Sequence, residues 1–215
     1  MYERVSRMDS LNYNNVIYCT NVFDDLINLK QNIDLINVKL NYPPIYVASN
    51  GIDILENISE NVKFKYWGAN QGWQLGALNS CLESIKFALH DIGVDECKNK
   101  KFIFSHEDIF ISDLDKIFYL MEQLDVFDII ATKYNGPGNP NIEESPYYML
   151  EAFLFSGRII EKFSKIETYD NTTLINCAEV TFGNIIKTKL KLKIKDIEFG
   201  HIDRINHMGF YYSEL

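Results

Sequence analysis

The sequence has no excess of positive charge. Its 215 residues carry 21 Lys and Arg side chains against 30 Asp and Glu, for a formal net charge of −9. Electrostatic binding to nucleic acid needs a basic surface that neutralises phosphates, so this balance argues against a nucleic-acid partner. It argues only weakly against an anionic nucleotide ligand, because a bound cation can supply positive charge locally.

Long apolar runs and paired cysteines are also missing. No hydrophobic stretch approaches the roughly 20 residues of a membrane-spanning helix, so we expect any membrane contact to be peripheral. The four cysteines show no C-x-x-C spacing, and the first fifteen residues are polar and mixed in charge, unlike a signal peptide. We therefore expect a cytoplasmic protein with reduced thiols.

The remaining composition is that of a globular chain with a sizeable core. Hydrophobic residues make up 47% and charged residues 24%, values that are ordinary for soluble proteins. No repeat, low-complexity tract or clear boundary divides the chain. We predict a single domain over residues 1–215, with residues 1–14 forming a polar arm.

Strand and helix patterns alternate along the first half of the chain. Apolar, β-prone runs occupy residues 16–20, 45–48 and 62–67, and a helical pattern that Asp24 or Asp25 can cap separates the first two. This order implies a right-handed crossover between parallel strands. A long apolar stripe after residue 75 predicts a helix that Gly93 ends. The pattern predicts an α/β fold with a central, mostly parallel twisted sheet flanked by helices.

The second half continues the alternation. Strands are predicted at residues 102–104, 128–131 and 152–155, and helices at 112–124, 157–163 and from a cap at 170–172 onward. Lysines at every odd position from 187 to 195 predict a strand with one lysine face, which protects a sheet edge or binds anionic lipid head groups. Residues 135–141 predict a loop, either a plain surface loop or a mobile active-site loop.

Small residues mark the entrance to the long helix. Gly72, Gly76 and Ala77 lie where free backbone N–H groups and the positive end of the helix dipole favour a phosphate. The same glycines can instead serve close packing of the helix on the sheet. Both interpretations remain open from the sequence.

Residues 101–113 form the stretch around which the chain is organised. A short apolar strand ends at His106, Glu107 and Asp108, and ligands bind at the carboxyl ends of strands in open α/β sheets. Because side chains alternate along an extended chain, His106 and Asp108 can hold one divalent cation, with Glu107 turned away. The alternative is an acid-rich helix start. His201 or His207, near the C-terminus, can complete a cation site.

Together these pieces resemble the family-2-like glycosyltransferases of the GT-A fold. Residues 16–21 are similar to the first strand of the nucleotide site, and residues 47–53 to the second strand with its turn near the base and ribose. Residues 70–79 resemble the Asn-x-Gly and Ala-x-Asn entrance to the long helix. Residues 102–114 lie where the metal-binding Asp-x-Asp motif falls, with a His-x-Asp variant in its place.

The resemblance implies a function and a set of site residues. It implies a metal-dependent, inverting glycosyltransferase that uses Mn²⁺ or Mg²⁺, a nucleotide-diphosphate sugar (a UDP-sugar) and a carbohydrate or other hydroxyl acceptor. Glu179 resembles the general base, and His106, Asp108, His201 and His207 the metal ligands. The residues implied for donor binding are Thr20, Asn21, Asn50, Asp53, Asn70, Gly72, Gly76, Asn79 and Glu107.

Two alternatives remain beside this interpretation. A nucleotidyltransferase on a related fold needs a basic, glycine-rich loop after the first strand, and residues 20–26 contain no Gly, Lys or Arg. A catalytically degenerate module that binds a nucleotide sugar or carbohydrate is the other, motivated by the His-for-Asp change and the short chain.

Overall fold

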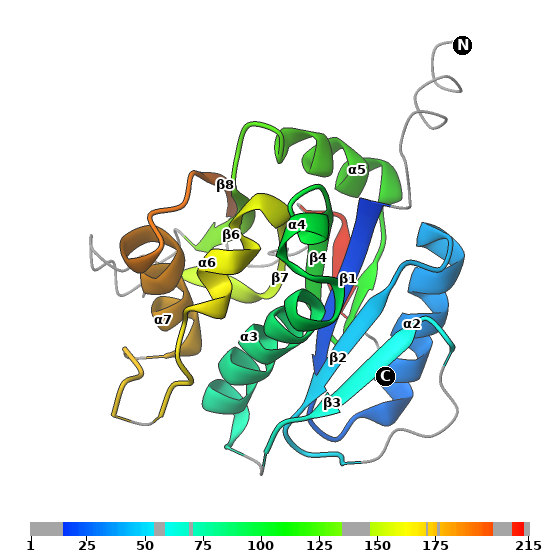
Figure 1. The fold of residues 1–215 in the computed structure, drawn as a ribbon, viewed down its shortest axis with the longest axis horizontal. Coiled ribbons are helices and arrows are strands. Elements are labelled where there is room, and N and C mark those ends of the chain that lie inside the picture. Colours follow the sequence, from blue (N-terminus) through cyan, green and yellow to red (C-terminus); the bar gives the residue numbers. More distant parts are fainter. Residues whose placement is uncertain are drawn as a thin grey trace.

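The computed structural model describes residues 15–53, 59–68, 71–134, 147–170, 172–175, 177–199 and 208–212. Its centre is a seven-stranded sheet in the order β3-β2-β1-β4-β7-β6-β8 (Figure 1). The strands are β1 (Val16–Val22), β2 (Ile45–Ser49), β3 (Val62–Tyr66), β4 (Lys101–His106), β6 (Ile129–Tyr134), β7 (Tyr148–Ser156) and β8 (Ile194–Phe199). The polar arm and the loop predicted at 135–141 lie outside the described residues.

Most strand pairs in the sheet are parallel. β1 pairs in parallel with β2 and β4, β2 with β3, and β6 with β8, whereas β7 runs antiparallel to both β4 and β6. The predicted α/β architecture with a mostly parallel sheet is confirmed. A second, two-stranded sheet joins β5 (Ile109–Ile111) to β9 (Phe210–Tyr212), a pairing that the sequence did not predict.

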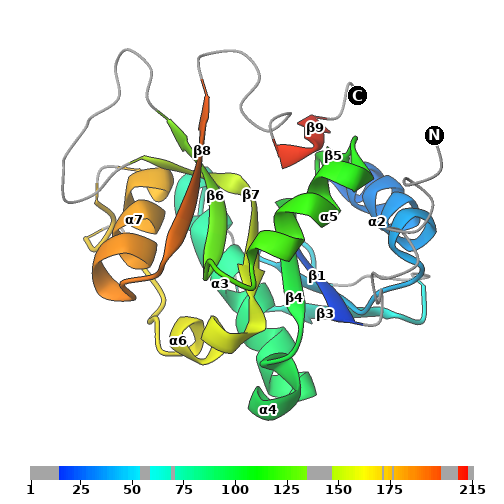
Figure 2. The ribbon, with the colours of Figure 1, turned by 90° about the horizontal axis from the view of Figure 1, so that it is seen from above.

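Helices cover both faces of the sheet (Figures 1 and 2). α2 (Leu26–Leu40) and α5 (Leu114–Gln123) pack on one face. The other face carries α3 (Trp73–Ile92), α4 (Val94–Cys97), α6 (Ile160–Ser164) and α7 (Ala178–Asn184). A 3-10 turn (Gly157–Ile159) precedes α6, and a π-helix (Ile185–Lys189) follows α7. No helix among the described residues is long and apolar enough to cross a bilayer.

Two predicted caps form as expected. The Asp25 side chain accepts the Asn28 backbone N–H at 3.0 Å at the start of α2. Gly93 ends α3, and its N–H donates to the Leu89 carbonyl at 2.9 Å. The cap predicted at 170–172 is wrong as a helix start: Asp170 accepts the backbone N–H groups of Thr172 and Thr173 in a turn, and α7 begins only at Ala178.

The lysine strand predicted over residues 187–195 is also wrong for most of its length. The helical path of α7 continues into the π-helix, because Ile185 and Ile186 are buried in the core. The Leu192 N–H then donates to the Ile186 carbonyl at 2.9 Å. Only from Ile194 does the chain form a strand, β8, at one edge of the sheet. Binding of anionic lipid head groups by these lysines stays a prediction.

Gly157 joins β7 to α6 at a point where two backbones nearly touch. A Cβ atom on this residue would lie 1.7 Å from the Cys97 carbonyl oxygen and 2.8 Å from that of Lys100. We expect Gly157→Ala to lower the free energy of unfolding by roughly 3 kcal/mol or more, measured by urea titration.

Gly72→Ala is the matched control for this prediction. A Cβ at Gly72 meets nothing within 4 Å, but the residue has φ +78° and ψ 170°, a backbone region that is almost confined to glycine, so backbone strain alone of about 1–3 kcal/mol is expected. If Gly157→Ala cost no more than Gly72→Ala, the close approach to Cys97 would be disproved.

Candidate functional site

Three neighbouring strands end together at the carboxyl edge of the sheet. Asn21 of β1 pairs with His106 of β4 on one side and with Ala48 of β2 on the other, and Asn50 follows directly after β2. Asn21 Oδ1, Asn50 Nδ2 and His106 Nε2 are buried and have no hydrogen-bond partner among the described residues. Buried polar atoms are normally satisfied, so this edge is a place where a ligand or water is expected to bind.

The turn after β4 gathers three potential metal ligands. Each of His106, Glu107 and Asp108 offers one possible ligand atom, and these three atoms lie within 4.8 Å of one another. The expectation that Glu107 turns away is therefore not met. The strand stops at His106 and the chain turns before β5 begins at Ile109, so the alternation of an extended strand no longer applies. Imidazole nitrogen and carboxylate oxygen together suit Mn²⁺, and the carboxylates suit Mg²⁺.

A buried hydrogen-bond network holds this turn in place. The Asn32 side-chain amide, from α2, donates to the carbonyls of His106 at 3.3 Å, Glu107 at 3.3 Å and Ile109 at 3.0 Å. The Ser105 hydroxyl donates to the Ile109 carbonyl at 3.2 Å and also bonds the Tyr18 hydroxyl. The backbone of the turn is thus fixed from both α2 and β1, as a preorganised site requires.

Burial sets the protonation of two of the three side chains. It lowers the pKa of His106 to about 4, so the imidazole is neutral near pH 7 and able to bind a metal. Burial raises the pKa of Glu107 to about 7, and the charge of Asp108 adds to that rise. The Phe23 N–H, which donates to Glu107 Oε1 at 3.3 Å, acts in the opposite direction.

The raised pKa of Glu107 predicts a pH-dependent stability of the metal-free protein. Its carboxyl holds a proton more tightly in the folded state than in the unfolded chain, where the ordinary value of 4.5 applies. The contribution of Glu107 to the free energy of unfolding is therefore greatest below about pH 4.5. It falls as the pH rises through about 7, by roughly 3 kcal/mol in all.

Glu107→Gln removes this titration. In urea unfolding with a chelator present, the wild-type protein should lose roughly 3 kcal/mol more than Glu107→Gln between about pH 4.5 and pH 8. Parallel losses in both proteins would show that Glu107 is not the group responsible.

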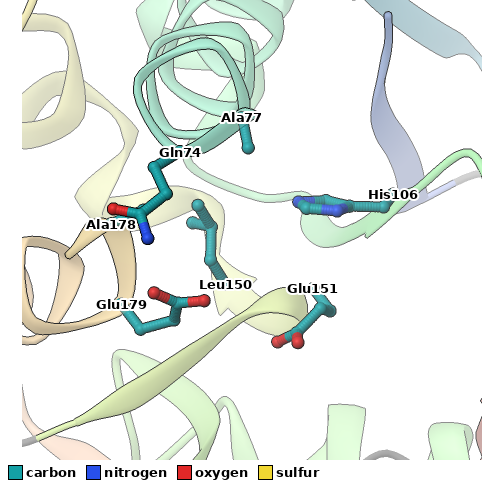
Figure 3. Close-up of a pocket in the computed structure, with 7 residues that line it drawn as sticks. All are labelled: Gln74, Ala77, His106, Leu150, Glu151, Ala178 and Glu179. Carbon is teal, nitrogen blue, oxygen red and sulfur yellow. The ribbon is translucent and has the colours of Figure 1, made fainter. Parts of the chain in front are cut away.

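A small pocket connects the turn to α7 (Figure 3). Its volume is about 10 Å³, room for about one water-sized group. Glu179, in the first turn of α7, faces it together with His106, so the predicted base and one predicted metal ligand meet there. The lining also includes two polar side chains that the sequence did not single out, Gln74 and Glu151.

The two glycines at the start of α3 differ in their surroundings. A Cβ on Gly76 would lie 2.2 Å from Asn50 Nδ2, so Gly76 lets α3 pack directly against the Asn50 side chain, which would have to shift for a larger residue. Gly72 has a positive φ, a backbone conformation that glycine adopts more readily than other residues. Asn79 is structural, because its amide donates to Gln71 Oε1 and to the Tyr169 carbonyl and accepts the Tyr169 N–H.

The other predicted donor-site residues lie as follows. Thr20 is fully buried in the sheet, with its hydroxyl donating to the Asn21 carbonyl at 3.3 Å. Asp53 is exposed on the loop after β2. Three further predicted residues, Asn70, His201 and His207, lie outside the described residues.

The comparisons identify the fold. No protein-family model and no curated protein sequence matches this chain. A glycosyltransferase involved in glycosylation of the major capsid of PBCV-1 superposes with a TM-score of 0.51 at 9% identity, and 92% of each chain is covered. The chain has the GT-A fold.

Two other solved structures resemble this chain with similar TM-scores. The mannosyltransferase PcManGT from Pyrobaculum calidifontis, solved with GDP-Man and Mn²⁺, has a TM-score of 0.51 at 10% identity over 93% of this chain and 63% of its own. The bifunctional IspDF from Campylobacter jejuni has a TM-score of 0.52 at 12% identity over 86% of this chain. This chain spans half the length of the Campylobacter protein.

Proposed function

We propose that this chain is a glycosyltransferase that moves a sugar from a nucleotide-diphosphate donor to a hydroxyl acceptor with the help of a divalent cation. One observation carries the proposal: the His106–Asp108 turn and Glu179 face a common region at the carboxyl edge of a GT-A sheet. The similar structures of a glycosyltransferase and a mannosyltransferase, which have the same fold, support it.

The residues of the turn would hold the cation. Asp108 and Glu107 offer carboxylate oxygens and His106 a neutral imidazole nitrogen. Mn²⁺ or Mg²⁺ supplies positive charge next to the departing diphosphate when bound. Such charge would also offset the acids Asp108, Glu151 and Glu179, which would otherwise repel a nucleotide diphosphate.

Glu179 would act as the general base. As the acceptor oxygen forms its bond to the anomeric carbon, the bond from that carbon to the diphosphate oxygen breaks, and Glu179 takes the proton of the attacking hydroxyl. A single carboxylate base that acts on the acceptor favours inversion at the anomeric carbon. The π-helix and core packing behind α7, including Phe182 against Phe153 with ring centroids 4.8 Å apart, fix the helix that carries it.

Donor binding is the direct test. We expect UDP-sugars to bind in isothermal titration calorimetry and to raise the melting temperature, both only with Mn²⁺ or Mg²⁺. GDP-sugars belong in the same panel, because the Pyrobaculum mannosyltransferase was solved with GDP-Man. No binding of any nucleotide sugar with either metal would overturn the proposal.

The same panel separates the enzyme from a binding module that has lost catalysis. A module binds the donor without turnover, and Glu179→Gln then changes nothing measurable. An enzyme releases nucleoside diphosphate from the donor, by transfer or by slow hydrolysis, and Glu179→Gln suppresses that release.

A further inference from the structure

The lysines at odd positions from 187 to 195 are a sequence feature that the candidate site does not use. Two explanations were open from the sequence, protection of a sheet edge and binding of anionic lipid head groups. Edge protection requires the lysines to lie on an edge strand. β8 begins only at Ile194, so Lys195 lies on that strand and the other four lysines precede it. Edge protection therefore does not explain most of the run.

The run is a local excess of positive charge on a negatively charged chain. Residues 187–195 contain five lysines and no acidic residue, whereas the whole chain has a formal net charge of −9. The four lysines that precede β8 are all exposed. Clusters of about this size attract the head groups of anionic lipids.

The chain changes direction in the middle of the run. Lys191 has φ +50°, in the left-handed region, and Leu192 beside it is buried in the core. Glycine adopts this backbone conformation at lower cost than lysine, so the turn itself does not explain why a lysine occupies the position. Figures 1 and 2 show the link between α7 and β8 at the periphery of the molecule.

Uncharged groups orient three of the lysines. Lys189 Nζ donates to the Tyr169 hydroxyl at 2.7 Å. The Nζ atoms of Lys193 and Lys195 lie 5.3 and 5.7 Å from the centroid of the Phe127 ring. None of these partners carries a negative charge, so the contacts position the ammonium groups without neutralising them.

An exposed apolar side chain lies next to these lysines. Val126, which precedes the Phe127 ring beneath Lys193 and Lys195, is 55% exposed. Lysines that extend around an apolar residue suit the interface of a bilayer, where the apolar side chain enters between the head groups and the ammonium groups meet phosphate. This combination favours a lipid surface over a folded acidic protein.

We propose that residues 187–195 form a docking surface for the anionic head groups of a lipid bilayer, with Val126 beside it. The proposal does not depend on the proposed function. Glu179, in the first turn of α7, faces the pocket, whereas the docking surface begins at Lys187, in the π-helix that continues α7. The docking surface and the pocket therefore lie toward opposite ends of one continuous helical segment.

Vesicle co-sedimentation of the full chain tests this assignment. Vesicles of phosphatidylcholine with about 30% phosphatidylserine are compared with vesicles of phosphatidylcholine alone. The wild-type protein should bind only the anionic vesicles at about 100 mM NaCl, and roughly 500 mM NaCl should release it, because salt screens exposed charges. The triple variant Lys187→Gln, Lys191→Gln and Lys193→Gln should bind the anionic vesicles about tenfold more weakly or worse.

Two further variants separate the docking surface from general effects of charge and folding. Lys30→Gln, Lys63→Gln and Lys98→Gln together remove three exposed lysines elsewhere, so this matched control loses the same charge and should bind as wild type. Arginine at positions 187, 191 and 193 keeps the charge and should keep the binding. All three variants should melt at the wild-type temperature.

Each other outcome counts against the assignment. It is wrong if the wild-type protein does not bind anionic vesicles, or binds both kinds of vesicle equally. Equal weakening by the two triple glutamine variants would show that net charge, rather than this surface, controls binding. Binding of soluble polyglutamate without binding of vesicles would identify a surface for an acidic protein instead of a bilayer.

Discussion

Glu179→Gln is expected to reduce sugar transfer by roughly 10²- to 10⁴-fold, the usual contribution of a positioned general base. The glutamine keeps the size and hydrogen-bonding shape of the side chain but cannot take a proton. Glu179 is 8% exposed in the first turn of α7 and lines the pocket, so the substitution should leave the fold intact. The measurement is steady-state release of nucleoside diphosphate from the donor that binds in the calorimetric panel.

Donor affinity separates catalysis from binding in this variant. We expect the Kd for the nucleotide sugar to stay within about threefold of the wild-type value, because Glu179 acts on the acceptor side. Glu167→Gln is the matched control, an exposed acid in the segment between α6 and α7, and it should behave as wild type. A Glu179→Gln protein with wild-type turnover would remove Glu179 from the mechanism.

Asp108→Asn should abolish metal-dependent donor binding. The asparagine keeps the shape of the side chain but replaces an anionic ligand with a neutral one. The loss in metal affinity should exceed the roughly 10- to 100-fold that removal of an outer-shell partner costs. Calorimetric titration of Mn²⁺, with and without the nucleotide sugar, measures it, and turnover should fall with it.

Asp115→Asn, on the exposed face of α5, serves as the control for Asp108. Both variants lose one negative charge, so a general effect of net charge on cation binding would appear in both. Mn²⁺ binding of Asp108→Asn that equals that of the control would show that the cation, if bound at all, is held elsewhere.

Much of the fold follows from local sequence patterns. β1, β2 and β4 are buried along nearly their whole length, and such strands stand out as short apolar runs. α3 presents a stripe from Leu75 to Ala88 to the core, which an amphipathic period identifies. These elements also place the carboxyl edge, so the position of the His106–Asp108 cluster could be predicted.

The features that the sequence did not predict correctly depend on contacts between residues far apart in the chain. The direction of Glu107 depends on a turn fixed by Asn32, a residue more than seventy positions earlier. β5 has three residues and exists through pairing with β9, about a hundred positions later. The lysines at odd positions mimic a strand, whereas burial of Ile185 and Ile186 keeps the chain helical. Tertiary contacts decide all three, and no local pattern reports them.

Glu151, which lines the pocket, was not singled out from the sequence for a different reason. Its signal was present in the sequence as one acid inside an apolar run at residues 148–156. The strand predicted there covered only residues 152–155, so Glu151 lay outside it, whereas β7 begins at Tyr148 and includes Glu151.

A structure of the protein with Mn²⁺ and UDP, with anomalous scattering to locate the metal, tests the central claim most directly. We expect one Mn²⁺ peak within about 2.5 Å of a carboxylate oxygen of Asp108, with the diphosphate between the metal and the first turn of α3. A bound nucleotide with no metal at residues 106–108, or a metal held away from this turn, would contradict the proposed site.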